Sequence, residues 1–196
     1  MKKLTLVLLA GFSFAIAHAQ LAFGIKGGAN ISNVGGSDAG GTSSLVGFNA
    51  GAYLNIPILV QHLSLEPELV YSAQGFKETS GGITTTQHIN YLNIPILFKY
   101  SFGGVFVETG PQAGILMSAK AKALGETADD KNGFFGADWA WVFGAQVKIP
   151  MTPITVDARY NFGMSNIINE NENNGNTLNG CFQIGVMVSL FTAPIK

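Results

Sequence analysis

Two carboxylates placed two residues apart, Glu66 and Glu68, are the residues best spaced for chemistry. In a strand, residues i and i+2 point to the same face, so both carboxylates would share one side of a sheet. Pairs of carboxylates perform acid–base chemistry in glycosidases. The chain also offers several cations on comparable faces, and ion pairing is the simpler use of both groups. We therefore expect Glu66 and Glu68 to be paired with cations and assign them no catalytic role.

His88 is a second candidate, as a general base acting with Asp129 or Asp130. No serine or aspartate motif surrounds His88, so nothing in the sequence supports a hydrolase there. Glu126 with Asp129 and Asp130 could offer oxygen ligands to a metal, but an acidic cluster in a polar segment usually serves only to keep that segment solvated. We predict no catalytic residue, no cofactor and no metal site, and we do not classify the chain as an enzyme.

The composition indicates a membrane-embedded β protein. Only 12% of the 196 residues are charged, about half the roughly 25% of a soluble domain, whereas 47% are hydrophobic and 25 are glycine. No segment beyond the N-terminal region has the roughly 18 consecutive apolar residues of a transmembrane helix. Helices and closed barrels are the structures that satisfy every backbone group in lipid, so a closed barrel in a single domain is expected. Cys181 is the only cysteine, which excludes an internal disulfide.

The N-terminus has the layout of an export signal. Lys2 and Lys3 precede an apolar stretch at 4–17, and Ala17-His18-Ala19 supplies the small residues of a cleavage site. We predict that residues 1–19 are a cleaved signal peptide and that residues 20–196 form the barrel domain. Loss of the two lysines would take the net charge from −1 to −3, which gives no basic footprint for nucleic acid.

Apolar and polar residues alternate with period two in eight segments, the pattern of half-buried strands. The expected strands are 21–32, 46–56, 63–76, 89–100, 105–117, 135–148, 154–165 and 178–191. The segments between them are alternately long and polar (33–45, 78–88, 118–134, 166–177) and short (57–62, 101–104, 150–153). This rhythm is typical of an up-and-down antiparallel outer-membrane barrel with long outer loops and short periplasmic turns.

Alternation alone does not decide which face is inside, because a soluble lipocalin-like barrel alternates too. Three features favour a transmembrane barrel. Glycines lie mostly on the polar face, where a narrow interior needs space; the apolar face carries aromatic residues suited to an interfacial girdle; and the total charge is small for a solvated surface. The aromatic residues are Tyr100, Trp139, Tyr160 and Phe162.

The polar face then lines the lumen, and it carries both signs of charge. Buried charges must be paired, so we predict an ion-pair network that fills the interior of the barrel. Its expected members are Lys26, Glu66, Glu68, Lys99, Glu108, Asp138, Lys148, Asp157 and Arg159. Eight strands leave an interior just wide enough for side chains. The alternative is a narrow or gated pore in which these pairs rearrange.

The last expected strand resembles an insertion signal for the barrel assembly machinery. Gln183, Gly185, Val188 and Leu190 alternate up to Phe191, although residues 192–196 continue beyond that aromatic residue. The expected partners are therefore outer-membrane lipid, the assembly machinery during insertion, and proteins that contact the long outer loops.

Motifs along nearly the whole mature chain resemble the small outer-membrane β-barrel proteins of Bacteroidetes, the PorT-like or outer-membrane β-barrel-domain family, which have an OmpA-like barrel. The matching stretches are FGIKGGANIS at 23–32, GFNAGAY at 47–53, PELVYS at 67–72, YLNIPIL at 91–97 with Lys99-Tyr100, Glu108 with Gly110-Pro111 and Gly114, and ARYNFGM at 158–164. The resemblance implies an exported barrel in the outer membrane of a Gram-negative cell. One member of the family is linked to secretion, a role that the resemblance alone does not transfer.

Three functions follow in order of preference. The first is a structural, anchoring or interaction protein, with an accessory role in secretion or surface assembly as one form of it. The second is a narrow channel for ions or small solutes. The third is a surface enzyme with its site at the extracellular rim near His88.

Overall fold

The computed structural model describes residues 20–36, 41–58, 62–168 and 177–194, so the predicted signal peptide at 1–19 lies outside the described residues. The described residues form nine strands and one short 3₁₀ helix, η1. Their bounds are β1 Gln20–Gly36, β2 Thr42–Pro57, β3 Leu63–Ser80, β4 Ile83–Phe102, β5 Val105–Ala123, β6 Glu126–Asp129, η1 Lys131–Gly133, β7 Ala137–Lys148, β8 Ile154–Asn166 and β9 Thr177–Pro194.

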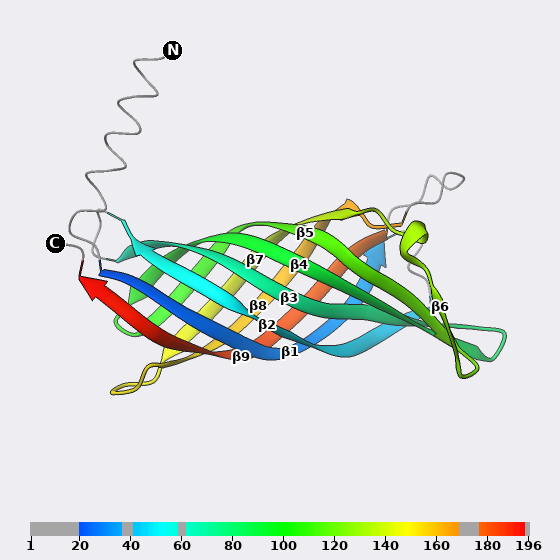
Figure 1. The fold of residues 1–196 in the computed structure, drawn as a ribbon, viewed down its shortest axis with the longest axis horizontal. Helices are drawn as coiled ribbons and strands as arrows, with labels where there is room; N and C mark the ends of the chain where they lie inside the picture. Colours follow the sequence, from blue (N-terminus) through cyan, green and yellow to red (C-terminus); the bar gives the residue numbers. More distant parts are fainter. Residues whose placement is uncertain (1–19, 37–40, 59–61, 169–176, 195–196) are drawn as a thin grey trace, which may run out of the picture.

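Eight of the strands close into a ring of antiparallel neighbours (Figure 1). Strands β1 to β5 pair in chain order, as do β7, β8 and β9; β5 pairs with β7, and β1 pairs with β9 to close the barrel. The prediction of a closed, all-β, eight-stranded antiparallel barrel is confirmed. Strand β6 is an addition to it: it pairs with the end of β5, from Lys120 with Asp129 to Ala123 with Glu126, and continues the sheet beyond the ring.

The connections at the two ends of the barrel differ. At the end where β1 begins and β9 ends, β4 and β5 are joined through Gly103-Gly104, and the other connections are also short. At the opposite end the strands run further than predicted. The segment 78–88, expected to be a loop, continues β3 and β4 to a turn at Gly81-Gly82. Threonines favour strands, and Gly-Gly suits a two-residue hairpin turn.

The segment 118–134 is likewise no open loop. Strand β5 continues to Ala123, and β6 and η1 follow. The end where β1 begins and β9 ends has the short turns that are typical of the periplasmic side of outer-membrane barrels. We therefore name it the periplasmic end and name the end with the extended hairpins the extracellular end.

The two faces of the barrel wall have opposite character. Outward side chains are large, apolar and exposed, such as Phe143 at 57% and Val186 at 44%. The four aromatic residues predicted for a girdle all lie on this outer face and are exposed. Inward polar side chains are almost fully buried, including Glu66 at 0% and Arg159 at 2%. No helix among the described residues is long and apolar enough to cross a membrane.

Candidate functional site: the interior of the barrel

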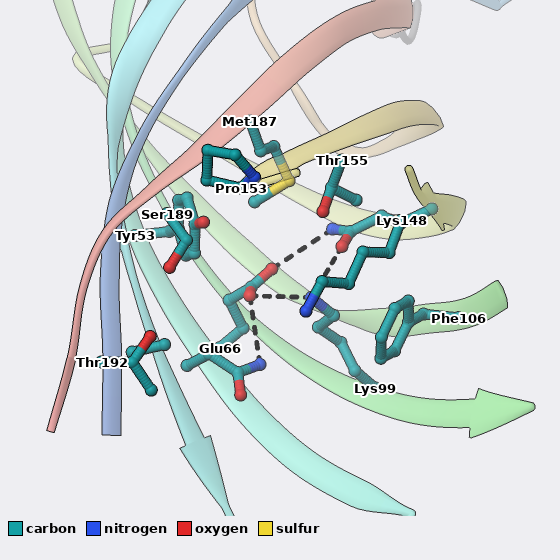
Figure 2. Close-up of a pocket in the computed structure, with 13 residues that line it drawn as sticks. Tyr53, Glu66, Lys99, Phe106, Lys148, Pro153, Thr155, Met187, Ser189 and Thr192 are labelled. Atoms are coloured by element: carbon teal, nitrogen blue, oxygen red, sulfur yellow. Dashed lines mark hydrogen bonds and ion pairs between the residues drawn. The ribbon is translucent and has the colours of Figure 1, made fainter. Parts of the chain in front are cut away.

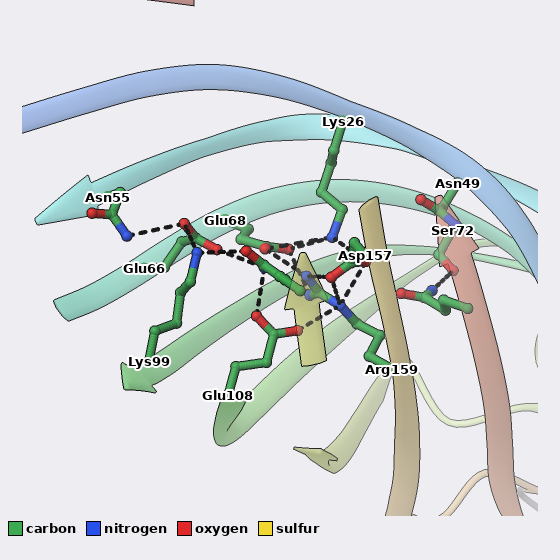
Figure 3. A network of polar contacts seen from close by, with 12 residues as sticks. Lys26, Asn49, Asn55, Glu66, Glu68, Ser72, Lys99, Glu108, Asp157 and Arg159 are labelled. Atoms are coloured by element: carbon green, nitrogen blue, oxygen red, sulfur yellow. Dashed lines mark hydrogen bonds and ion pairs between the residues drawn. The ribbon is translucent and has the colours of Figure 1, made fainter. Parts of the chain in front are cut away.

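The centre of the lumen is occupied by a charged cluster around Arg159 (Figure 3). The Arg159 guanidinium donates two parallel hydrogen bonds of 3.0 Å to Glu68, from Nη1 to Oε2 and from Nη2 to Oε1. It also donates to Asp157, with Nη2 to Oδ2 at 2.8 Å. Lys26 joins the same two carboxylates, at 3.2 Å to Glu68 Oε2 and 3.4 Å to Asp157 Oδ1. Two cations thus share two carboxylates, with every member buried.

Glu108 extends this cluster towards β5 and β7. Its Oε1 lies 3.2 Å from Arg159 Nε, as an ion pair without hydrogen-bond geometry, and its Oε2 accepts a 2.6 Å hydrogen bond from Gln146. Gln146 also donates to Glu66 Oε1 at 3.3 Å. The amide of Gln146 therefore links the Arg159 cluster to a second group of charges nearer the periplasmic end.

That second group is the pair formed by Lys99 and Glu66. Lys99 Nζ lies 2.8 Å from Glu66 Oε2 and donates a 2.6 Å hydrogen bond to Gln146 Oε1. Asn55 donates to the same Glu66 oxygen at 3.2 Å. Glu66 and Glu68 share one face of β3, as their spacing predicted, and both contact cations.

The structure brings together seven of the nine residues predicted for the network and leaves two apart. Asp138 is buried but accepts hydrogen bonds from neutral groups, Ser165 at 2.9 Å and Asn179 at 3.2 Å. Lys148 is exposed at the periplasmic end of β7 and makes no ion pair within the described part of the chain. Alternation indicates which face of the wall a residue is on, but not its position along the barrel axis. Asp138 lies on the extracellular side of the Arg159 cluster and Lys148 on the periplasmic side.

Gln146 and Asn55 are the contributors that the sequence analysis did not include. Both lie on inward positions of their strands, and Gln146 shares its face with Asp138 and Lys148. The same alternation that selected the charged residues could have selected these amides, since a buried amide also needs partners.

A cavity of about 280 Å³ lies on the periplasmic side of the Lys99–Glu66 pair (Figure 2). Tyr53, Phe106, Met187 and Lys148 contribute to its walls. Glu66, Lys99 and Gln146 also line it, so the cavity adjoins the charged network.

Two glycines make space for bulky neighbours in this half of the lumen. A Cβ on Gly144 would lie 2.5 Å from Glu108 Oε1 and 2.8 Å from Arg159 Cβ. A Cβ on Gly24 would lie 2.5 Å from the Tyr53 ring. Glycine at these positions allows the strands to approach the side chains that fill the barrel.

Neutral polar side chains fill the lumen above the charged cluster. Asn30 donates to Ser72 Oγ at 2.9 Å and accepts from Asn49 at 2.7 Å. Further towards the outside, Asn179 donates to Gln74 Oε1 at 2.6 Å. The bonds from Asn30 to Ser72 and from Asn179 to Gln74 join strands that are not neighbours in the ring, β1 with β3 and β9 with β3.

The extracellular end of the lumen is apolar, which the prediction of a polar filling did not include. Buried residues of β1, β3, β4, β5 and the two adjoining connections form one cluster, here named the outer apolar cluster: Val34, Phe76, Ile89, Tyr91, Leu116, Ala119, Phe134 and Ile167. The adjoining connections are themselves paired, with Phe135 N donating to Ile167 O at 2.9 Å. A second, chemically different layer therefore fills the barrel at its outer end.

The candidate rim residues lie on different segments and have different partners. His88 lies opposite Lys120, which lies opposite Asp129, so His88 and Asp129 are two strands apart. Asp130 instead accepts a 2.9 Å hydrogen bond from Gln87. Across residues 20–36, 41–58, 62–168 and 177–194, no three His, Cys, Asp or Glu side chains are grouped as metal ligands would be.

Comparison with known families identifies the family that has this architecture. Residues 12–169 match the family model described as outer membrane protein beta-barrel domain. The chain belongs to this family. It is accordingly an outer-membrane β-barrel protein, and the apolar outer wall is its lipid-facing surface. A search of curated proteins found no match.

Solved structures with a similar fold are outer-membrane barrels. Neisserial surface protein A (NspA) is 13% identical, with a TM-score of 0.54 over 86% of this chain and 97% of that one. Ail, the attachment invasion locus protein of Yersinia pestis, is 13% identical, with a TM-score of 0.51 over 86% of this chain and 98% of Ail. A second Ail structure, in complex with the heparin analogue sucrose octasulfate, is 14% identical, with a TM-score of 0.50 over 88% and 99% of the two chains. At such identities the likeness concerns the fold.

Proposed function

We propose that this barrel is a non-conducting anchor that holds its β3–β4 and β5–β6 hairpins at the cell surface for interaction with other molecules. The observation that carries the proposal is the bond between Arg159 on β8 and Glu68 on β3. These strands are four positions apart in the eight-stranded ring, so the ion pair spans the full width of the lumen. The outer apolar cluster obstructs the lumen a second time.

Energetics support a permanently filled interior. Separating the Arg159 cluster to open a path would leave buried charges without partners, which costs several kcal/mol per group, on the order of 3–5 kcal/mol. The apolar cluster would in addition have to admit water. A channel that opens spontaneously would need both rearrangements together, whereas an anchor needs neither.

Planar-bilayer recording of the refolded protein tests the proposal, with a general porin as the positive control in the same membrane. We expect no steady conductance from this barrel. A reproducible, ion-selective conductance step would overturn the anchor and favour the alternative, a narrow channel for ions or small solutes.

The proposal includes export and assembly. Cleavage after Ala19 would leave Gln20 as the first mature residue, and β9 would carry the signal read by the barrel assembly machinery. The intact mass of the protein extracted from outer membranes measures the cleavage site directly. A mass that includes residues 1–19 would contradict this part of the proposal.

The proposed role requires an interaction partner at the cell surface. One form of this role is an accessory function in secretion or surface assembly, as in PorT-like proteins of Bacteroidetes. A photo-crosslinking residue at Thr84, near the tip of the β3–β4 hairpin, would capture a partner in native membranes. The same residue at Thr155, on the periplasmic side of the lumen, is the matched control. Crosslinks to a secretion component from Thr84 alone would support the accessory role, and equal crosslinking from both positions would contradict a surface contact.

A further inference from the structure

Three lysines and a histidine gather on one outer face of the extracellular hairpins. Lys77 on β3 lies opposite Thr86 on β4, which lies opposite Lys122 on β5. In the next row His88 lies opposite Lys120. Strands are spaced by about 4.8 Å and successive rows on one face by about 6.7 Å, so the Cβ atoms of all four residues fall within roughly 12 Å of one another. We name Lys77, His88, Lys120 and Lys122 the outer basic cluster.

This cluster continues the lipid-facing wall and not the lumen. On β3, Lys77 shares its face with Leu69 and Tyr71, which are exposed on the outside of the barrel. On β5, a register shift between Leu116 and Ser118 alters the alternation. After this bulge Ala119 is the inward residue, at 0% exposure, and the lysines on either side of Ala121 point outward. The bulge therefore moves two cations from the lumen side to the outer side.

The cluster lies just beyond the apolar band. Met117, exposed at 50%, is the last apolar outward residue of β5, and Lys120 follows three residues later, about 10 Å further along the strand. Figure 1 shows the β3–β4 and β5–β6 hairpins extending at the end of the barrel opposite the start of β1. Lysine stems can lie along apolar surface while their ammonium groups reach the headgroup layer of the outer leaflet.

The positive charge of the cluster is not neutralised by ion pairs within the described part of the protein. The buried cations Lys26, Lys99 and Arg159 all form ion pairs, whereas the three clustered lysines form none with the described residues. Asp129, opposite Lys120 in the register, is the carboxylate on the same face. Glu78 alternates to the other face, and Asp130 is bonded to Gln87. Three lysines and one aspartate leave an excess of positive charge on this surface.

We propose that the outer basic cluster binds the phosphate groups of outer-leaflet lipids and so fixes the depth and rotation of the barrel in the membrane. The inference rests on the outer-membrane location and on the assignment of the hairpins to the extracellular side. Lysine ammonium groups bind phosphate as point charges, and each cation near an anionic lipid surface strengthens binding by about fivefold. The apolar wall directly below supplies the acyl-chain contact that a soluble phosphate lacks.

The test compares lipid retention by native mass spectrometry for the full barrel refolded in detergent. The probes are phosphatidic acid, which carries a phosphomonoester, and zwitterionic phosphatidylcholine. The test variant is Lys120→Gln/Lys122→Gln. The matched control is Lys131→Glu, which changes the net charge equally on the same side of the membrane and lies outside the cluster. Heat-modifiable gel mobility verifies that each variant is folded, and Lys77→Gln serves if the double variant fails to fold.

We expect the wild type to retain phosphatidic acid in preference to phosphatidylcholine. The double variant should lose this preference by about 25-fold, the single variant by about fivefold, and Lys131→Glu should keep it. Equal losses in the double variant and the control, or no preference in the wild type, would overturn the proposal. Displacement of the lipid by inorganic phosphate would instead identify a soluble phosphate ligand, and displacement by a sulfated polysaccharide would identify a glycan; either result overturns lipid binding. None of these outcomes alters the non-conducting anchor, which bilayer conductance tests separately.

Discussion

Arg159 and Glu68 join opposite walls of the barrel through two parallel hydrogen bonds of 3.0 Å, with both side chains buried. The planar guanidinium matches a carboxylate in this geometry, which a lysine ammonium does not. Because Arg159 also contacts Asp157 and Glu108, one cation holds three carboxylates in the middle of the lumen.

Arg159→Met should strongly destabilise the barrel. Methionine has a similar length but leaves three buried carboxylates with Lys26 as their nearest cation. Breaking a buried pair by removing one partner costs about 3–5 kcal/mol. The measurement is the free energy of unfolding by urea in lipid vesicles, with Lys131→Gln as the control for the loss of one exposed charge. A loss below about 1 kcal/mol for Arg159→Met would show that the cluster contributes little to stability.

The sequence predicted the faces of the wall well and the depth of each residue poorly. Strict alternation in β8 identifies the lumen side of Asp157 and Arg159, because the side-chain direction of a strand repeats every two residues. It does not say that Lys148 reaches the mouth of the barrel or that Asp138 lies among neutral partners. The position of a residue along the barrel axis depends on strand tilt and on the register with non-neighbouring strands. The sequence of a single strand contains neither.

The extracellular end shows a second limit of the sequence. The bulge after Leu116 changes which residues face outward, and a change of one residue cannot be read from a polar stretch without apolar alternation. The threonines and the Gly81-Gly82 turn carry a hairpin signal in 78–88 that apolar alternation does not reveal. The outer apolar cluster is not predicted for a related reason, since Phe134 lies within a segment predicted to be a loop and Phe76 lies close to another.

Gly144→Ala should weaken the charged cluster without altering its composition. The added methyl group would meet Glu108 Oε1 and Arg159 Cβ, so both side chains must shift. Overpacking of this kind costs about 1–3 kcal/mol in the free energy of unfolding. Gly35→Ala is the matched control, because no atom lies within 4 Å of a Cβ at that position. Equal unfolding midpoints for the two variants would contradict a tightly packed interior.

Cys181 gives a direct test of the closed interior, because it is the only cysteine and is 1% exposed on the lumen side of β9. A water-soluble maleimide added to the folded barrel should not label this thiol over the time in which it labels the urea-unfolded chain completely. The control is Cys181→Ser carrying Thr84→Cys, which places the sole thiol on the exposed hairpin and should react at once. Rapid labelling of Cys181 in the folded barrel would indicate that water and small solutes reach the lumen.

Phe134→Ala should loosen the outer end of the barrel. Phe134 is 7% exposed and packs in the outer apolar cluster, whereas its neighbour Phe135 is 44% exposed. Removal of a buried phenylalanine side chain costs about 3–5 kcal/mol, and a surface substitution stays within about 0.5 kcal/mol. The two variants can be compared by urea unfolding and by the rate at which added protease cleaves the connection between β6 and β7. We expect faster cleavage and lower stability for Phe134→Ala alone. Equal effects of both substitutions would mean that the apolar cluster does not hold this connection over the mouth, and that the charged cluster around Arg159 is the main obstruction in the lumen.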